Sequence, residues 1–573
     1  NLLQSNRPVE LTQISPIQED IPSPEFLSIG KGARRSSAPK TLGTITGNTF
    51  KTDHTGKKVV FDHQDLLEFA GGRIAEVFGQ DYAIIDSYER CVRLPLDPYL
   101  LVTRVTELEA EPHQFKHCGI TTEYDIPKQA WFATDERIPW AVAIESGQCD
   151  LMLISYLGID FQNRGNRVYR LLDCTMTFMK ALPRGGQTLR YEIHIDSFAR
   201  HGGSLLFFFH YECFVGDQMV LKMAGGCAGF FTKEELDQGK GVIHTEKEIQ
   251  ARQQIQQTNF TPLLHCNQTA FEREELLHLV QGNPSKCFGG EYDQNQKNSS
   301  LRMAPEQLLM NDRILNVDSK GGAWGLGIVE SEKLLRPDDW YFVCHFYKDP
   351  VMAGSLIAEG CVQLLQFYML YLGLQTLTED ASFEPILNLP QIVRCRGQVI
   401  PSDSLMTYRL EVKEIVLYPE PFMIANIDVL VEDRIVVDFR DVGVRLVEKK
   451  TDVINFSILA KPDNRAKPAY DEVAIQNFAD GSVAKCFGAH YAPFDARPFV
   501  QRNPCLDLKL LTRVQEVSGE PRNFSKPASL IAEFDVNEMN WYFSDETSIA
   551  PLPACVLLEI ALQPCGFLGA WMG

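Results

Sequence analysis

A histidine and an acid, separated by a turn, are the residues of this chain best suited to transfer protons. His345 is followed by Asp349, Pro350 and Gly354, and then by an apolar segment whose only acid is Glu359. Histidine suits proton abstraction because its pKa lies near neutral pH. A carboxyl group among apolar neighbours suits proton donation, because desolvation raises its pKa and keeps it protonated. The pattern predicts acid–base chemistry at the start of an apolar helix.

The segment from Leu356 to Leu372 predicts that helix. It is too long for a strand, and a helix that is apolar on all faces must lie inside protein or lipid. Glu359, Gln363 and Gln366 argue against lipid, because an acid at membrane depth costs about 2.5 to 3.5 kcal/mol. The aromatic residues 340–345 predict a strand that leads into the histidine. We therefore expect a helix wrapped by a sheet, with a histidine at its N-terminal end.

This segment resembles the active-site segment of β-hydroxyacyl-thioester dehydratases, most closely the β-hydroxydecanoyl dehydratase/isomerase type. The resemblance rests on His345-Phe346, Asp349-Pro350-Val351-Met352, Gly354, Leu356, an acid fourteen residues after the histidine, and Arg396-Gly397-Gln398-Val399. The chain departs from the family at Ala353, where proline is usual, and at Glu359, where aspartate is usual. The resemblance implies an α+β hotdog fold, in which an antiparallel sheet wraps around a buried helix. Arrays of such domains occur in polyunsaturated fatty acid synthases, the assemblies this chain most resembles.

Landmarks that recur with a nearly constant period predict three homologous units. They are Phe-Gly at 78, 288 and 487, Arg at 104, 313 and 513, Trp at 131, 340 and 541, and a helix acid at 145, 359 and 559. We expect a flexible linker at 1–57, hotdog A at 58–250, hotdog B at 251–450, and hotdog C at 451–573. Because the chain ends just after the third apolar helix, the predicted architecture is one complete double hotdog plus a truncated third unit.

The resemblance also implies how the units pair, because members of the family place two hotdogs side by side. Each active site then joins the histidine of one hotdog to the helix acid of the other. Carried onto this chain, that arrangement joins His345 with Glu145, which lies in a helix predicted over residues 141–158. Asp150, in the same predicted helix, competes with Glu145 for the acid's role.

Units A and C lack the histidine. Glu136 and Glu546 stand at its offset from the tryptophan. In unit B, Glu359 is a second candidate catalytic acid, but its reciprocal site would have Glu136 facing it in place of a histidine and should be inactive. Glu559 of unit C would serve a histidine in a further unit after Gly573.

The activity that the resemblance implies is removal of water from 3-hydroxyacyl thioesters carried on the phosphopantetheine of an acyl carrier protein, in fatty acid or polyketide synthesis. The same groups could exchange 2-trans and 3-cis enoyl products. Backbone N–H groups at Gly354 and Ser355 would bind the thioester oxygen. Elimination needs only proton transfer, so no cofactor is expected. Two alternatives stay open: a hotdog acyl-thioesterase, or a non-catalytic acyl-binding scaffold.

Charge and cysteine usage narrow the partners. The net charge is −20, from 55 basic and 75 acidic residues, which argues against nucleic acid or an anionic membrane. Fifteen cysteines without a disulfide-scaffold spacing indicate reduced thiols in a cytoplasm. His113, His117 and Cys118 lie close together but lack further ligands, so no metal site is expected. We expect no signal segment and no membrane span, and we expect the other domains of a multidomain synthase as partners.

Overall fold

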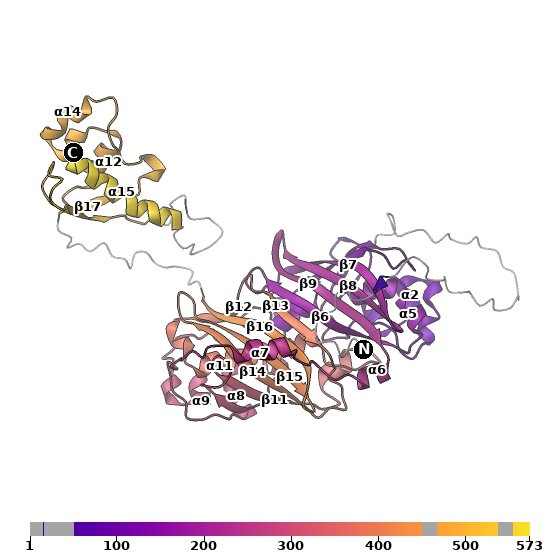
Figure 1. Cartoon of the computed structure of the whole chain (residues 1–573). Coiled ribbons are helices and arrows are strands. Elements are labelled where there is room, and N and C mark those ends of the chain that lie inside the picture. Colours follow the sequence, from indigo (N-terminus) through magenta and orange to yellow (C-terminus); the bar gives the residue numbers. More distant parts are fainter. Residues whose placement is uncertain (1–14, 17–50, 450–466, 537–541, 543–553) are drawn as a thin grey trace, which may run out of the picture. The chain divides into compact units, whose positions relative to one another are not determined.

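The computed structural model describes residues 15–16, 51–449, 467–536, 542 and 554–573. The chain divides into two compact units, Asn1–Glu448 and Lys449–Gly573, which Figure 1 colours from indigo to orange and from orange to yellow. Both contain helices and antiparallel strands, so the α+β class predicted from the sequence is correct.

Fourteen strands among the described residues of the first unit form one antiparallel sheet. Its order is β10-β11-β14-β15-β16-β13-β6-β9-β8-β7-β5-β4, with β1 on β7 and β12 on β16. The strands are β1 (Ser15–Pro16), β4 (Arg104–Glu109), β5 (Cys118–Asp125), β6 (Val168–Phe178), β7 (Thr188–His201), β8 (Ser204–Val215), β9 (Gln218–Phe231), β10 (Arg313–Asp318), β11 (Ile328–Leu334), β12 (Ala381–Pro385), β13 (Gln391–Cys395), β14 (Leu405–Val416), β15 (Phe422–Val431) and β16 (Arg434–Glu448).

That strand order separates the sheet into two halves that meet at one seam. We call the half with β4–β9 the A half, and the half with β10–β16 the B half. Across the seam β6 pairs antiparallel with β13, in a register that runs from Met176 opposite Gln391 to Asp173 opposite Arg394. Figure 1 shows the two halves side by side along this seam. The paired strands therefore bring residues far apart in the sequence into one site.

Each half sheet packs one face on its own helices. In β15, for example, buried and half-buried residues alternate along the whole strand, as expected for a strand with one face in the core. The B half wraps around α11 (Gly354–Tyr371), which contacts β11, β14, β15 and β16. This helix confirms the one predicted from the apolar run, and it is buried along nearly its whole length. It ends before Gly373, whose φ of 84° suits the left-handed conformation common after helices.

The corresponding helix of the A half is broken, and the prediction of one helix over residues 141–158 is wrong. The chain forms α3 (Trp140–Glu145), α4 (Asp150–Tyr156) and α5 (Ile159–Asn163). The break has a tertiary cause. The hydroxyl of Tyr191, on β7, donates a 2.6 Å hydrogen bond to the carbonyl of Ala143, which a continuous helix would use for the N–H of Gly147. That N–H bonds to Ile144 instead.

The strand predicted over residues 340–345 is also wrong, because Trp340–Cys344 form a short helix, α10. Asp339 precedes it and fixes the turn, since its carboxylate accepts hydrogen bonds from the N–H of Arg336 and the hydroxyl of Tyr341. A short apolar run does not by itself distinguish a strand from a helix. His345 still lies at the end of this element, as expected.

Residues 51–57 belong to the first unit, which corrects the linker prediction at its C-terminal end. β2 (Lys51–Thr52) and β3 (Lys58–Val59) form a hairpin. Asp53, whose side chain is almost fully buried, lies 2.7 Å from Nε of the equally buried Arg104. Apart from Ser15–Pro16, the remainder of the predicted linker lies outside the described residues.

The other elements are shorter. The first unit adds α1 (His63–Gly71), α2 (Ile74–Phe78), α6 (Lys233–Asp237), α7 (Glu246–Gln253), α8 (Arg273–Val280) and α9 (Pro284–Phe288). Single 3-10 turns span Gln80–Tyr82, Ile85–Ser87, Gly290–Tyr292, Glu306–Leu308, Leu374–Leu377, Ala489–Tyr491 and Leu506–Leu508.

The second unit contains α12 (Glu472–Asp480), α13 (Val483–Phe487), α14 (Ala492–Asp495), β17 (Arg513–Ser518), β18 (Ser529–Glu533) and α15 (Ala554–Met572). Phe567 of α15 packs in a small core with Ile475, Phe478 and Val514. The window Cys555–Met572 is, among the described residues, the one stretch long and apolar enough to cross a membrane by length and composition, and 28% of it is buried in the protein.

Candidate active site

His345 and Glu145 meet at the seam between the halves. Nε2 of His345 lies 3.6 Å from Oε1 of Glu145. His345 comes from the loop that follows α10 in the B half, and Glu145 is the last residue of α3 in the A half. The side chains are 9% and 5% exposed, so solvent barely reaches them. The structure thus brings together the two residues that the family resemblance pairs.

The surroundings of His345 leave Nε2 as the ring nitrogen that can accept a proton. Nδ1 lies 2.8 Å from the carbonyl oxygen of Val351, and a carbonyl can only accept, so Nδ1 carries the hydrogen. Burial lowers the pKa of His345 to about 4. The imidazole is therefore neutral at pH 7, with the lone pair of Nε2 directed toward the seam.

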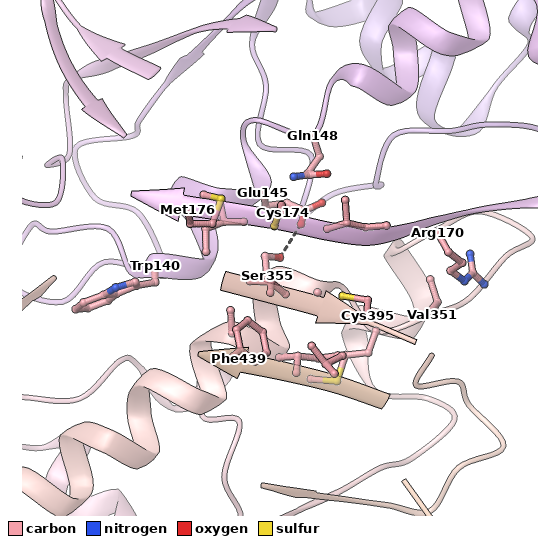
Figure 2. A pocket seen from close by; sticks show the side chains of 18 of the residues that line it. Trp140, Glu145, Gln148, Arg170, Cys174, Met176, Val351, Ser355, Cys395 and Phe439 are labelled. Carbon is pink, nitrogen blue, oxygen red and sulfur yellow. Dashed lines mark hydrogen bonds between the residues drawn. The ribbon is translucent and has the colours of Figure 1, made fainter. Parts of the chain in front are cut away.

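The pKa of Glu145 is shifted in the opposite direction to that of His345. Burial raises the pKa of its carboxyl group to about 7, although the hydrogen bond from Ser355 lowers it. The Ser355 hydroxyl donates to Oε2 at 2.6 Å; Figure 2 marks this bond with a dashed line across the seam. A large fraction of Glu145 is thus protonated near neutral pH, and the group can act as an acid.

A mostly apolar cavity of about 140 Å³ adjoins both groups. The A half contributes strand and helix residues such as Trp140, Leu151, Cys174, Met176 and Phe178, and the B half contributes Phe346, Ile357, Val393, Cys395 and Phe439. Figure 2 shows several of these side chains between the strands that meet at the seam. Such a lining suits an acyl chain.

The first turn of α11 borders the same cavity with Gly354 and Ser355. The first N–H groups of a helix have no partner within it, and they carry the positive end of the helix dipole. A side chain added at Gly354 would meet no atom within 4 Å, so the space beside this amide is open. The two predicted oxyanion residues are therefore placed beside open space near His345.

Two ion pairs fasten the seam around this site. Arg170 of β6 binds Asp349 with two hydrogen bonds of 2.7 and 2.9 Å, and Gln398 with one of 2.9 Å. Arg396 binds Asp173 at 2.9 Å, and both side chains are buried. Asp349 and Arg396 belong to the motif residues of the B half, so these residues act in part by holding the A half.

Glu359 occupies the equivalent place in the B half but meets no histidine among the described residues. Its carboxyl group accepts hydrogen bonds from the N–H of Ala141 (3.1 Å) and the amide of Gln363 (3.2 Å). Burial raises its pKa to about 7. Its surroundings include Thr134, Asp135 and Arg137, whose side chains offer no neutral base like His345.

The prediction that Glu136 faces Glu359 is wrong. The side chain of Glu136 is 74% exposed and lies 4.0 Å from Arg184. Asp135 and Glu136 form the tip of a turn with positive φ angles, closed by hydrogen bonds between Thr134 and Arg137. This turn directs Glu136 to solvent. Glu546, the other glutamate at the histidine's offset, lies outside the described residues.

Asp150, the competing acid of the A half, has a different partner. The hydroxyl of Tyr169 donates to its Oδ2 at 3.1 Å, and burial raises its pKa to about 8. Among the described residues, Tyr169 lines the cavity and Asp150 does not. Of the two acids, Glu145 is the one beside the histidine.

Among the described residues, one cluster has the spacing of metal ligands: His244, Asp428 and Asp438. Arg440 donates to both of these aspartates, and Arg394 donates to Asp438 at 2.8 Å. The positive charges of the two arginines already balance the carboxylates, so the cluster is better described as an ion-pair network.

One protein-family model matches most of the B half. Residues 303–440 match the model of the FabA-like domain. That range contains the histidine, the oxyanion residues, the second acid and α11. The antiparallel sheet around α11 is thus the hotdog fold that the sequence resemblance implied, while Glu145 lies outside the matched range and comes from the A half.

A relative extends this similarity beyond the FabA-like domain. The chain is 34% identical over 639 residues to a polyunsaturated fatty acid synthase protein of Thraustochytrium sp., one of the subunits of that synthase. The match covers 90% of this chain and 42% of the relative. The chain thus spans less than half the length of that relative.

Two solved structures also align with the chain. A trans-AT polyketide synthase dehydratase domain of Brevibacillus brevis is 12% identical, with a TM-score of 0.32, over 62% of this chain and 100% of its own. An oleoyl thioesterase from Lactobacillus plantarum is 7% identical, with a TM-score of 0.30, over 57% and 95%.

Sequence reasoning missed the roles of several residues of the site. Val351 orients the histidine through its carbonyl, Arg170 binds the turn, and the hydroxyl of Tyr99 lies 2.9 Å from that of Ser355. The first two act through contacts that only the fold creates. Tyr99 did leave a signal, because it replaces a leucine of the other repeats.

Proposed function

We propose that this chain is a dehydratase that removes water from 3-hydroxyacyl thioesters in polyunsaturated fatty acid or polyketide synthesis. The single observation that carries the proposal is the 3.6 Å approach of His345 Nε2 to Glu145 Oε1 beside an apolar cavity. The FabA-like domain and the relative from a polyunsaturated fatty acid synthase support it.

In the proposed reaction, Nε2 of His345 takes the α-proton of the thioester. The electron pair of that C–H bond forms the double bond as the bond to the 3-hydroxyl breaks. Glu145 gives its proton to the departing oxygen, which leaves as water. The N–H groups of Gly354 and Ser355 bind the thioester oxygen, on which negative charge develops. His345 and Glu145 both start in the protonation state that these reaction steps require.

The proposed architecture is a double hotdog of residues 58–250 and 251–450, followed by a third, truncated hotdog at 451–573. The A and B halves of the sheet support the first part. For the third unit, Glu559 of α15 supports the proposal, because it accepts from Gln563 at 3.1 Å as Glu359 accepts from Gln363 in the B half.

We further propose that the substrate arrives on the phosphopantetheine of an acyl carrier protein, within a cytoplasmic multidomain synthase that continues with more hotdog sequence. Elimination by His345 and Glu145 requires no cofactor or metal. The same two groups could move a proton between the α- and γ-carbons, and we include 2-trans to 3-cis isomerisation in the proposal.

The test uses the full chain and a 3-hydroxyacyl pantetheine thioester, with the products analysed by mass. The proposal expects an enoyl thioester, which His345→Ala should abolish. His265→Ala, which changes an exposed histidine hydrogen-bonded to Asn267, is the control and should leave turnover unchanged. Release of the free acid would instead favour a thioesterase, and binding without either product would favour a scaffold. Both outcomes contradict the proposal.

A further inference from the structure

The acids of two repeats are held by the same glutamine device. In the B half, the amide of Gln363 donates to Glu359 at 3.2 Å and to the carbonyl of Leu308 at 2.8 Å, and its oxygen accepts from the N–H of Met310 at 2.9 Å. The second unit repeats all three bonds with Gln563, at 3.1, 2.7 and 2.8 Å. The glutamine thus ties each helix acid to the segment before the first strand of its sheet.

The A half lacks this device although it carries the acid beside His345. Counted from the start of the helix, Cys149 stands where Gln363 stands in the B half. A thiol cannot make the three hydrogen bonds of a carboxamide. Counted back from the recurring arginine, Tyr99 stands where Leu308 and Leu508 stand in the other repeats. The A half therefore differs from both other repeats at two positions of the same device.

Tyr99 reaches the acid by a different route. Its hydroxyl lies 2.9 Å from Oγ of Ser355, and that hydroxyl donates to Oε2 of Glu145 at 2.6 Å. Since a hydroxyl has one hydrogen, Ser355 must accept from Tyr99. Tyr99 is completely buried, and burial raises the pKa of its phenol well above the usual value, so the phenol remains a donor. Three hydroxyl and carboxyl groups thus form a one-directional chain.

This chain determines which oxygen of Glu145 carries the proton. Oε2 accepts from Ser355, so a proton on the carboxyl group resides on Oε1, the oxygen that faces His345 at 3.6 Å. If Tyr99 did not donate, the Ser355 hydroxyl would be free to rotate and accept from Oε2 instead. The proton would then point away from the position where a substrate would lie.

We propose that Tyr99 is a positioning residue that, through Ser355, directs the acidic proton of Glu145 into the cavity. The Tyr99–Ser355 pair takes the place of the glutamine that holds the acid in the other repeats. The inference rests on the proposed function, because it assigns Glu145 the role of the acid.

Tyr99→Phe tests the proposal in the full chain, since it removes one oxygen and keeps the ring. We expect kcat to fall about tenfold, the factor for one lost hydrogen bond of ordinary strength, with a smaller change in KM. Tyr82→Phe is the matched control, because Tyr82 is buried and donates to a backbone carbonyl in the same half. It should leave kcat unchanged.

The pH profile separates positioning from a structural role. When the Ser355 hydroxyl is free to accept a hydrogen bond from Glu145, the protonated form of Glu145 gains stability. The alkaline limb of the plot of kcat/KM against pH should therefore move to higher pH in Tyr99→Phe. Apart from removing the phenol itself, the substitution changes none of the titratable groups around Glu145. These groups are His345, Cys149, Asp150, Cys344, Tyr169 and Tyr211. A loss of activity that only follows the folded fraction, with an unmoved limb, would overturn the proposal.

A second pair of variants tests whether the Tyr99–Ser355 pair and the glutamine of the other repeats are equivalent in holding the acid. Tyr99→Leu should lose activity, and adding Cys149→Gln, which recreates the residues of the B half, should restore part of kcat. Where that double variant does not fold, Tyr99→Phe decides alone.

A further measurement separates this inference from the proposed function. The pH dependence of thermal unfolding reports the same protonation of Glu145 without turnover. The proposal requires the pH at which Glu145 loses its proton in this measurement to be higher in Tyr99→Phe than in the wild type. A wild-type chain without dehydration would contradict the proposed function, while the thermal shift would still decide the role of Tyr99.

Discussion

The carboxyl group of Glu359 accepts a 3.1 Å hydrogen bond from the N–H of Ala141, in the first turn of α3 in the other half. Glu145 makes the reciprocal contact, since it accepts from Ser355 in the first turn of α11. The start of each helix therefore faces the acid of the other. The two sites are related in geometry, but only one of them contains a histidine among the residues that the structure describes.

This asymmetry leads to a prediction about pH. The reaction needs neutral His345, which burial favours above about pH 4, and protonated Glu145, which burial favours below about pH 7. A plot of kcat/KM against pH should be bell-shaped, with limbs near these values. Glu359→Gln should keep both limbs. A profile that rises through pH 9 would show that Glu145 is not the acid.

The buried Glu145 should also make stability depend on pH. Its folded pKa of about 7 lies above the ordinary 4.5, so the folded state holds this proton more tightly than the unfolded state. That contribution is fully present below pH 4.5 and is lost as the pH rises through 7, which amounts to about 3 kcal/mol at pH 8. Glu145→Gln should therefore raise Tm relative to wild type more at pH 8 than at pH 5.

Thermal unfolding at both pH values provides the measurement. Glu76→Gln, at an exposed glutamate paired with Arg73, should change Tm alike at the two values. An equal effect of Glu145→Gln at pH 5 and pH 8 would contradict the assigned burial of the carboxyl group.

Gly354→Ala should reduce the turnover of substrate without reducing the stability of the protein. An added methyl group meets no protein atom within 4 Å, and alanine is the better helix former, so Tm should stay or rise slightly. The methyl group would occupy space beside the amide that binds the thioester oxygen, and kcat/KM should fall at least about tenfold. Gly290→Ala, at another glycine with open space, is the control. Full activity of Gly354→Ala would place the thioester elsewhere.

The seam itself can be tested at Asp173. Asp173→Ala leaves the buried guanidinium of Arg396 without its carboxylate partner, and loss of one member of a buried ion pair costs about 3 to 5 kcal/mol. Chemical denaturation should show a loss of this size. The double variant Asp173→Leu with Arg396→Met removes both charges and should lose less. A small effect of the single change would mean that the pair contributes little to joining the halves.

Local patterns predicted the elements that depend on local sequence. The apolar run predicted α11. The pairing of His345 with Glu145 followed from family resemblance together with the repeats. The break after Glu145 could not be predicted in the same way, because it depends on the Tyr191 hydroxyl from a strand distant in sequence. The outward turn at Glu136 likewise depends on backbone conformation.

The most direct test of the cross-seam site compares Glu145→Gln with Glu359→Gln. Both variants replace a buried helix acid by its amide, so they are matched in shape and burial. Single-turnover dehydration of a 3-hydroxyacyl pantetheine thioester should slow at least about 100-fold in Glu145→Gln, the usual effect of losing a general acid. It should remain close to wild type in Glu359→Gln. Loss of turnover in Glu359→Gln, with turnover retained in Glu145→Gln, would contradict the account.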